Sequence, residues 1–174
     1  MSSSTTEKSA GISAPQAFSA AVVTVSDSCS RGERTDISGP AVSDLLKKLG
    51  FHVVATRIVQ DDSMQIQNVL VHLALEARFI ATTGGTGIAE RDVTPEATEA
   101  ICDRLIDGVA ERMRLEGAKK TSFAALSRGV CGVRGKTLIL NLPGSPSGAV
   151  ESLQAVADLI PHALNLLDGK TEHP

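Results

Sequence analysis

The sequence contains no tryptophan and no tyrosine, and only four of its 174 residues are phenylalanine. Proteins that bind single-stranded nucleic acid stack bases on aromatic side chains and hold the phosphate backbone with clustered lysine and arginine. The net charge at pH 7 is −3, so the basic surface is missing as well. We therefore predict no nucleic-acid partner.

Long hydrophobic runs are also missing, since none approaches the roughly 20 residues that cross a bilayer. The first 17 residues are rich in serine, threonine and alanine and lack the hydrophobic block of a signal peptide. We expect residues 1–17 to form a disordered tail and residues 18–174 to form one domain. We expect no membrane association and a cytoplasmic location.

Cysteine is scarce: Cys29, Cys102 and Cys131 are widely spaced and form no C-x-x-C motif. An odd number of dispersed cysteines is typical of reduced thiols in a cytosolic protein, and less typical of a disulfide framework or a metal site. The four histidines have no partner at the spacing of zinc ligands. We predict buried or partly buried free thiols and no zinc centre.

What the sequence does contain is a regular alternation of apolar runs and amphipathic segments. Runs at 18–25, 52–59 and 78–83 are typical of strands in a parallel sheet, and a segment with helical spacing follows each of them. A further helix is predicted at 108–117. This alternation predicts a three-layer α/β domain.

The remaining elements are predicted from turn and cap signals. Two strands within 126–133 and 136–143 are expected to pair as a hairpin, and one long helix to run through Leu167 with a bend at Pro161. Expected helix caps are Ser38, either Asp61 or Asp62, and Thr94, whose helix is predicted to reach about Ile106.

Four loops lie at the carboxyl ends of predicted strands, where open α/β sheets bind ligands. They are residues 26–28, 60–62, 82–92 and 141–146. The third loop, TTGGTG followed by an Arg-Asp pair, contains Gly84, Gly85, Thr86 and Gly87. Glycines let a ligand approach the main chain, and a helix start favours anions, so this loop suits a phosphate. A tight turn without function is the alternative.

Charged residues support the first interpretation. Arg91 can clamp a phosphate, and Asp92 can hold Mg²⁺ or accept a proton from a heterocycle's amino group, although the two could simply form a surface ion pair. Asp27 and Asp61 each follow a strand and should enter the same crevice. Asp61 could instead be only a helix cap.

The fourth loop, NLPGSP, offers a second place for an anion. Its Gly144 and Ser145 N–H groups precede a helix, although Ser145 with Pro146 could be a purely structural helix start. Two such places with carboxylates between them suit a ligand that has phosphates at one end and a hydrogen-bonding ring at the other.

Several ordered motifs resemble the molybdenum-cofactor proteins of the MogA/MoaB type, which include the G domain of gephyrin. They are TVSDS (24–28), D-x-SG (36–39), TTGGTG-x-x-x-RD-x-TPEAT (82–98) and LSR…GKTLILNLPGSP (126–146). The resemblance covers nearly all of residues 18–168. It implies a mixed, mostly parallel sheet between helices and a homotrimer. The implied activity is transfer of AMP from ATP to molybdopterin, with Mg²⁺ and release of pyrophosphate.

The resemblance also implies roles for individual residues. Asp61 and Asp92 fall where the family has functional carboxylates, and we expect them to position substrate or Mg²⁺, with Asp92 as the candidate metal ligand. The pterin and nucleotide sites would be lined by Ser26, Asp27, Thr83, Gly84, Gly85, Thr86, Gly87, Arg91, Pro143, Gly144 and Ser145, with residues 29–37 as a cover.

Other functions remain open at this point. The chain could be a MoaB-type paralogue that carries molybdopterin without converting it, or an assembly scaffold. If it is the enzyme, it would hand its product to a molybdate-insertion protein. Gln60 departs from the proline that many members have there, which affects backbone stiffness more than chemistry.

Overall fold

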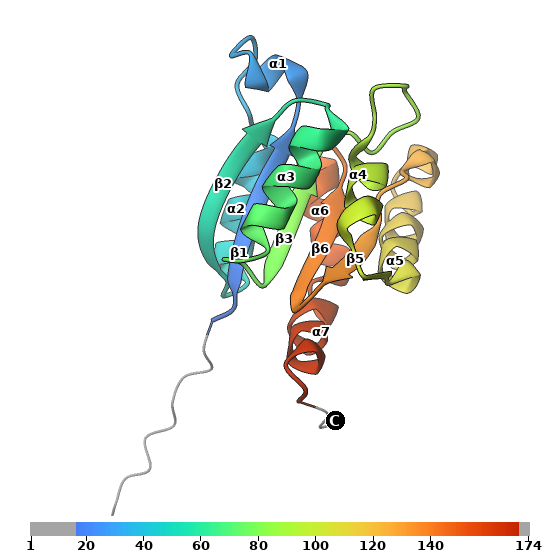
Figure 1. The fold of residues 1–174 in the computed structure, drawn as a ribbon. Helices are drawn as coiled ribbons and strands as arrows, with labels where there is room; N and C mark the ends of the chain where they lie inside the picture. The colour runs from blue at the N-terminus through green and yellow to red at the C-terminus, as the bar shows by residue number, and fades with distance from the viewer. Residues whose placement is uncertain (1–16, 171–174) are drawn as a thin grey trace, which may run out of the picture.

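The computed structural model describes residues 17–170, so most of the predicted tail lies outside the described residues. Within that range one sheet is flanked by helices on both faces (Figure 1). The strands are β1 Ser19–Val25, β2 His52–Val59, β3 Phe79–Thr83, β4 Arg104–Leu105, β5 Cys131–Arg134 and β6 Thr137–Leu142. The helices are α1 Asp27–Ser30, α2 Ser38–Lys48, α3 Ser63–Leu73, α4 Thr94–Ile101, α5 Asp107–Ala118, the 3₁₀ helix η1 Ser122–Leu126, α6 Pro146–Val156 and α7 Leu159–Leu167.

The strand order is β2-β1-β3-β6-β5-β4. Pairs β1–β2, β1–β3 and β3–β6 are parallel, whereas β5 pairs antiparallel with both β6 and β4. This confirms the predicted α/β fold with a mixed, mostly parallel sheet. The hairpin between β5 and β6 is confirmed too, with Gly135 at φ +56 in its turn. No helix within residues 17–170 is long and apolar enough to cross a membrane.

Two hydrophobic clusters fill the spaces between the layers. One packs α2, α5, α6 and α7 against one face of the sheet, and the other packs α3 and α4 against the opposite face. Residues of β1 alternate between the clusters: Val22 joins the first and Val23 the second, and both are at most 1% exposed. This is the two-sided burial that its continuous apolar sequence predicts.

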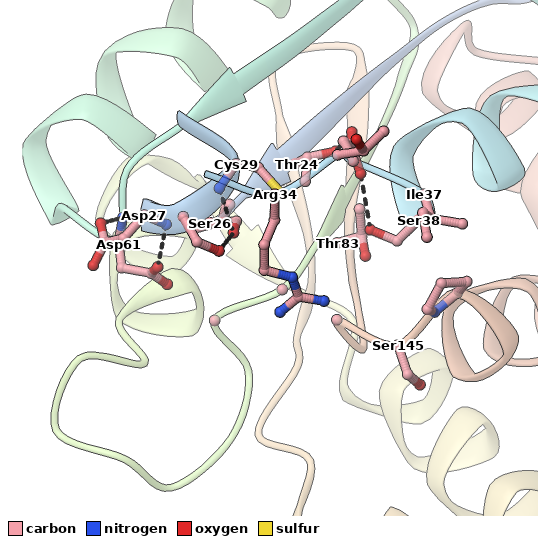
Figure 2. Close-up of a pocket in the computed structure, with 18 of the residues that line it drawn as sticks. Thr24, Ser26, Asp27, Cys29, Arg34, Ile37, Ser38, Asp61, Thr83 and Ser145 are labelled. Atoms are coloured by element: carbon pink, nitrogen blue, oxygen red, sulfur yellow. Dashed lines mark hydrogen bonds between the residues drawn. The ribbon is translucent and has the colours of Figure 1, made fainter. Parts of the chain in front are cut away.

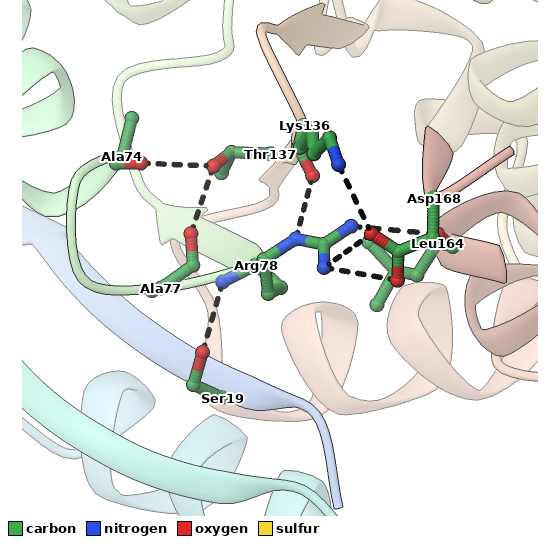
Figure 3. Close-up of polar contacts among 8 residues, drawn as sticks. All are labelled: Ser19, Ala74, Ala77, Arg78, Lys136, Thr137, Leu164 and Asp168. Atoms are coloured by element: carbon green, nitrogen blue, oxygen red, sulfur yellow. Dashed lines mark hydrogen bonds and ion pairs between the residues drawn. The ribbon is translucent and has the colours of Figure 1, made fainter. Parts of the chain in front are cut away.

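Arg78, just before β3, fastens α7 to the amino-terminal end of the sheet (Figure 3). Its guanidinium forms an ion pair with Asp168 at 3.0 Å and donates to the Lys136 carbonyl at 2.9 Å. The hydrogen bond from Arg78 lowers the pKa of the Asp168 carboxyl. Because this cluster sits where the parallel strands begin, it leaves their carboxyl ends free for a binding site.

The predicted helix from Thr94 to about Ile106 is wrong at its carboxyl end, because α4 stops at Ile101. Cys102 is extended, with ψ 142°, and the N–H groups of Asp103 and Ile106 donate to β5 carbonyl groups. Residues 104–105 then form the edge strand β4. Pairing with a neighbouring strand has therefore overridden an apolar spacing that fits a longer helix.

The predicted single long helix at the carboxyl end is two helices, α6 and α7, separated at residues 157–158. Pro161 lies within the first turn of α7. Proline has no N–H to donate to the carbonyl group four residues earlier, here that of Ala157, and its ring crowds that group. The interruption therefore falls before the proline instead of at it.

Two of the predicted helix caps are wrong. Ser38 lies inside α2, and the Asp36 side chain accepts from the N–H of Gly39 at 3.0 Å. Thr94 lies inside α4 and turns its hydroxyl to the Gly84 carbonyl at 3.0 Å. Asp62, one of the two alternatives, does cap α3 by accepting from the Gln65 N–H at 2.8 Å. That leaves Asp61 free of this task.

Asn141 in β6 connects three segments behind the site. Its amide donates to the hydroxyls of Thr82 at 3.0 Å and Thr98 at 2.9 Å, and its carbonyl accepts from the Val130 N–H at 3.2 Å. Asn141 is fully buried. Buried polar groups that lose their partners cost about 1–3 kcal/mol each.

We expect Asn141→Ala to lower the free energy of unfolding by about 2–4 kcal/mol, because it removes a buried side chain and three hydrogen bonds. Urea unfolding followed by circular dichroism measures the change. Asn68→Ala, on the exposed surface of α3, is the control and should change stability by less than about 0.5 kcal/mol. Equal values for the two variants would contradict the structural role of Asn141.

Candidate functional site

A cavity of about 550 Å³ opens at the carboxyl ends of the parallel strands (Figure 2). It lies where the chain passes from one side of β1 to the other, because β2 and β3 flank β1 in the sheet. Such a reversal of strand order leaves a crevice between the loops that follow neighbouring strands. Ten predicted site residues line it: Ser26, Asp27, Asp61, Thr83, Gly84, Gly85, Arg91, Asp92, Gly144 and Ser145.

Asp27 and Asp61 hold each other's main chain in place. The N–H of Asp27 donates to Asp61 Oδ2, and the N–H of Asp61 donates to Asp27 Oδ1, both at 3.0 Å. The Ser26 N–H also donates to the Val59 carbonyl at 2.9 Å. These bonds join the loops after β1 and β2, so both carboxylates lie at one wall of the cavity (Figure 2).

The Asp61 carboxyl has a raised pKa. Burial is the main cause, because it disfavours the charged form, and the nearby carboxylate of Asp27 acts in the same direction. A hydrogen bond from the Asp27 main chain and the charge of Arg91 oppose the rise. Asp61 is therefore a carboxylate at the wall of the cavity whose burial disfavours its charged form.

Asp92 is half-buried at the far end of the glycine loop. Its Oδ2 accepts from the Ala89 N–H at 3.0 Å, which closes a short turn, and among residues 17–170 no hydrogen bond reaches its Oδ1. Arg91 is exposed and lines the same cavity. Among the ion pairs of residues 17–170, none joins Arg91 to Asp92, so the surface-pair alternative is not realised.

The glycine loop follows β3 and has a conformation that only glycine adopts readily. Gly84 and Gly85 have φ values of +99° and +67°. A Cβ at Gly84 would overlap the carbonyl oxygen of Val25, and one at Gly85 would overlap the Thr94 hydroxyl. Close packing against β1 and α4 thus requires both glycines, in addition to any approach by a ligand.

Main-chain N–H groups of the loop are available to an anion. Within the described chain, the N–H groups of Gly85, Thr86, Gly87 and Ile88 donate to no protein acceptor. The start of α4, expected to help, does not: Thr94 is buried and its N–H donates to the Gly85 carbonyl at 3.1 Å. The loop itself, and not the helix behind it, offers the donors.

The loop after β6 lies directly against the glycine loop. The Gly84 N–H donates to the Leu142 carbonyl at 3.2 Å, and the Thr83 hydroxyl donates to the Pro143 carbonyl at 2.7 Å. Ser145 caps α6 by accepting from the Gly148 N–H at 3.2 Å, which is the structural role that the sequence left open as an alternative. The start of α6 therefore opens toward the cavity, where helix N-termini favour negative charge.

A second cavity, of about 600 Å³, adjoins the first across these two loops. The three remaining predicted site residues, Thr86, Gly87 and Pro143, line this second cavity, and Gly144 and Ser145 line both. Its other walls come from α5, η1 and α6 and include the exposed side chain of Phe123. Two compartments thus meet at one pair of main-chain loops.

The sequence motifs did not identify every residue in the first cavity. Residues 29–37, expected to cover the site, border the cavity. They begin within the one-turn helix α1 and contribute two cationic residues, Arg31 and Arg34. Figure 2 shows the Arg34 side chain reaching across the opening. Asp36 is present as well, held by the Thr24 hydroxyl at 2.6 Å. A general signal was available, namely cationic residues in a loop that follows a buried strand.

The cysteines are free thiols, as predicted, with Cys131 buried and the other two half-buried. Burial raises the pKa of the Cys102 thiol to about 11 and that of Cys131 to about 12. Both thiols therefore stay protonated near neutral pH. Within residues 17–170 no group of three or more histidine, cysteine, aspartate or glutamate side chains is arranged to hold a metal ion.

The fold and the site define a class: an α/β domain with a cavity at the carboxyl ends of its strands, lined by main-chain donors and by charged side chains. Comparison with known proteins makes the class specific. A family described as "Probable molybdopterin binding domain" matches residues 21–162. The chain belongs to this molybdopterin-binding domain family.

Individual molybdenum-cofactor proteins are also similar to the chain. The molybdopterin adenylyltransferase of Helicobacter pylori strain J99 is 40% identical over 155 residues, which cover 85% of this chain and 86% of that protein. The chain is 43% identical over 149 residues to the molybdenum cofactor synthesis protein cinnamon of Drosophila melanogaster, covering 84% of this chain but only 25% of that protein. The crystal structure of the molybdopterin biosynthesis enzyme MoaB from Thermus thermophilus matches with a TM-score of 0.83 at 52% identity, covering 88% of this chain and 98% of that one.

Proposed function

We propose that this protein is a molybdopterin adenylyltransferase, which transfers AMP from ATP to the terminal phosphate of molybdopterin. The observation that carries the proposal is the meeting of two cavities at the loops of residues 84–87 and 143–145. Each cavity is large enough for one substrate. The border between them consists of main-chain groups, against which two phosphates can approach each other closely.

The reaction needs no nucleophile from the protein. A phosphate oxygen of molybdopterin attacks the α-phosphorus of ATP, a new P–O bond forms, and the bond to the β-phosphate oxygen breaks to release pyrophosphate. Catalysis of such a transfer rests on positioning and on stabilising charge. The free N–H groups of the glycine loop supply donors fixed before the substrates arrive, and the dipole of α6 favours negative charge at its start.

The charged side chains of the first cavity fit a polyphosphate with its cation. Arg34 and Arg91 line it, and guanidinium groups bind phosphate oxygens in a bidentate manner. Arg31 lines it as well, but its guanidinium is paired with Glu33 at 2.7 Å. Asp61 and Asp92 suit Mg²⁺, which proteins commonly hold through one or two carboxylates together with substrate phosphates. When bound, Mg²⁺ would neutralise phosphate charge. Asp92, with one carboxylate oxygen available, is the residue we assign to it.

Release of pyrophosphate is the measurement that tests this function. Wild-type protein with Mg-ATP should release pyrophosphate only when molybdopterin is added, and each turnover should consume one ATP. The MoaB-type carrier is the second candidate. Tight molybdopterin binding without any pyrophosphate would contradict the enzyme and favour the carrier. Asp61 and Asp92 favour the enzyme, because a carrier has less need of two carboxylates beside phosphate sites.

The proposed location, oligomeric state and partner rest on the cysteine content and on the family resemblance. Free thiols suit a cytoplasmic enzyme. The family resemblance favours a homotrimer and a hand-over of the adenylylated product to a molybdate-insertion protein. Light scattering of the purified protein tests the trimer, for which a mass near three times 18.1 kDa is expected.

A further inference from the structure

Arg128 lies between η1 and β5 and lines neither cavity. Its main-chain N–H donates to the Thr86 carbonyl at 2.8 Å. Its side chain donates from Nε to the Gly87 carbonyl at 2.7 Å and from Nη2 to the Asp92 carbonyl at 2.5 Å. One guanidinium therefore joins both ends of the turn between Gly87 and Asp92, and Nη1 forms an ion pair with Glu96.

The carbonyl groups of the glycine loop are all turned into the protein. Those of Gly84 and Gly85 accept from the hydroxyl and the N–H of Thr94, and those of Thr86 and Gly87 accept from Arg128. In a trans peptide the carbonyl and the next N–H point in opposite directions, and the described residues contain no cis peptide. Fixing these four carbonyls therefore directs the N–H groups of residues 85–88 away from Thr94 and Arg128.

We propose that Arg128 is a positioning residue for the transfer reaction: its side chain holds the carbonyls of Gly87 and Asp92, its main-chain N–H holds that of Thr86, and together these bonds preset the N–H donors of the glycine loop. This inference rests on the proposed function for its catalytic part. Donors that are already oriented stabilise developing charge without a cost of reorganisation at the moment of reaction. Arg128 holds the half of the loop that faces the second cavity, since Thr86 and Gly87 line it.

The chemistry of arginine suits this task better than that of lysine. Its planar fork reaches several acceptors in fixed directions, whereas lysine is a point charge on a flexible stem. Glu96 balances the charge of the fork. Burial alone would raise the pKa of the Glu96 carboxyl, but hydrogen bonds from Arg128 and from its own main chain keep it below the ordinary value. The pair therefore stays ionised at neutral pH.

Three matched variants test the inference. Arg128→Gln removes the fork, Glu96→Gln removes only the ion pair, and Arg112→Gln breaks an unrelated surface pair with Asp158. For Arg128→Gln we expect kcat of molybdopterin-dependent pyrophosphate release to fall by about 10- to 100-fold, with KM for ATP within about threefold. Glu96→Gln and Arg112→Gln should stay within about threefold of wild type. Arg128→Lys, which keeps the charge, replaces Arg128→Gln if the latter does not fold, and its kcat should fall as well.

A second readout is independent of turnover. The N–H groups of Asp92 and Thr94 are hydrogen-bonded to the carbonyls of Ala89 and Gly85, so their amide exchange, followed by NMR, reports whether the loop stays closed. Exchange at both should accelerate at least about fivefold in Arg128→Gln and stay unchanged in the two controls. A wild type that releases no pyrophosphate would contradict the proposed function alone. Unchanged exchange in Arg128→Gln, or an unchanged kcat in a folded variant, would overturn the role of Arg128.

Discussion

Asp61→Asn and Asp92→Asn should each lower kcat of pyrophosphate release by at least about 100-fold, because each removes a negative charge that is proposed to hold the Mg²⁺ that would neutralise the reacting phosphates. Asparagine keeps the shape of the side chain and one carbonyl oxygen. It can still accept from the Asp27 N–H in the first case and from the Ala89 N–H in the second. The loss would therefore reflect charge and not a displaced loop. Asp62→Asn is the control, since Asp62 is exposed and caps α3.

At position 61 the substitution Asp61→Asn should lower activity but raise stability. Burial raises the pKa of the Asp61 carboxyl in the folded protein, so its charge destabilises the fold once pH exceeds that raised value. The Asp61→Asn protein should melt about 1–3 °C higher than wild type at pH 7.5. The difference should shrink as pH falls through the raised pKa toward the ordinary value of 3.8. A variant that melts lower than wild type at pH 7.5 would contradict this explanation of the shift.

Gly84→Ala should lower the free energy of unfolding by about 3–5 kcal/mol. Two costs add: a φ of +99°, which non-glycine residues avoid, and overlap of the new Cβ with the carbonyl oxygen of Val25 in β1. Neither group can move easily, because Val25 is part of β1 and Gly84 is bonded to Leu142. Urea unfolding at a fixed temperature gives the value.

The variant Gly50→Ala separates the cost of the left-handed backbone from the cost of the Cβ overlap. Gly50 has a similar φ of +88°, but a Cβ there would meet no atom within 4 Å. We expect it to lose only about 1 kcal/mol, the ordinary cost of a left-handed conformation for alanine. If Gly84→Ala were no more harmful than Gly50→Ala, the close packing between the glycine loop and β1 would not be what requires a glycine at position 84.

Elements whose local signals agree with their surroundings could be predicted from the sequence. The strand 52–59 has the predicted bounds, and β1 and β3 each begin one residue later than predicted. Turn residues and β-branched apolar runs act locally, and in these strands no pairing with a distant segment changes the structure that they favour. The end of α4 was mispredicted because what decides it is pairing with β5, about 30 residues further along the chain.

The functional site, like the fold, could be predicted only in part. Residues at strand ends could be assigned to one edge of the sheet because parallel strands end together, and the structure places all of them around two adjoining cavities. The partition into two cavities could not be predicted, since it depends on how the loop after β6 packs on the loop after β3. Arg128 belongs to the LSR motif, but no sequence signal assigned it a role, because its side chain contacts carbonyl groups 36 and 41 residues away and these carry no side-chain signature.

The position of Asp61 follows from a feature of the sheet. Asp61 is carried by the strand at one margin of the sheet, β2, which has a neighbour only in β1. Hydrogen bonds at a sheet margin open more readily than those at its centre. The hydrogen bonds between Asp27 and Asp61 join the loops just beyond the carboxyl ends of these two strands. Fraying of β2 would thus withdraw the Asp61 carboxylate from the site while the central strands stay paired. For the proposed enzyme we therefore expect activity to be lost at a lower temperature than the fold.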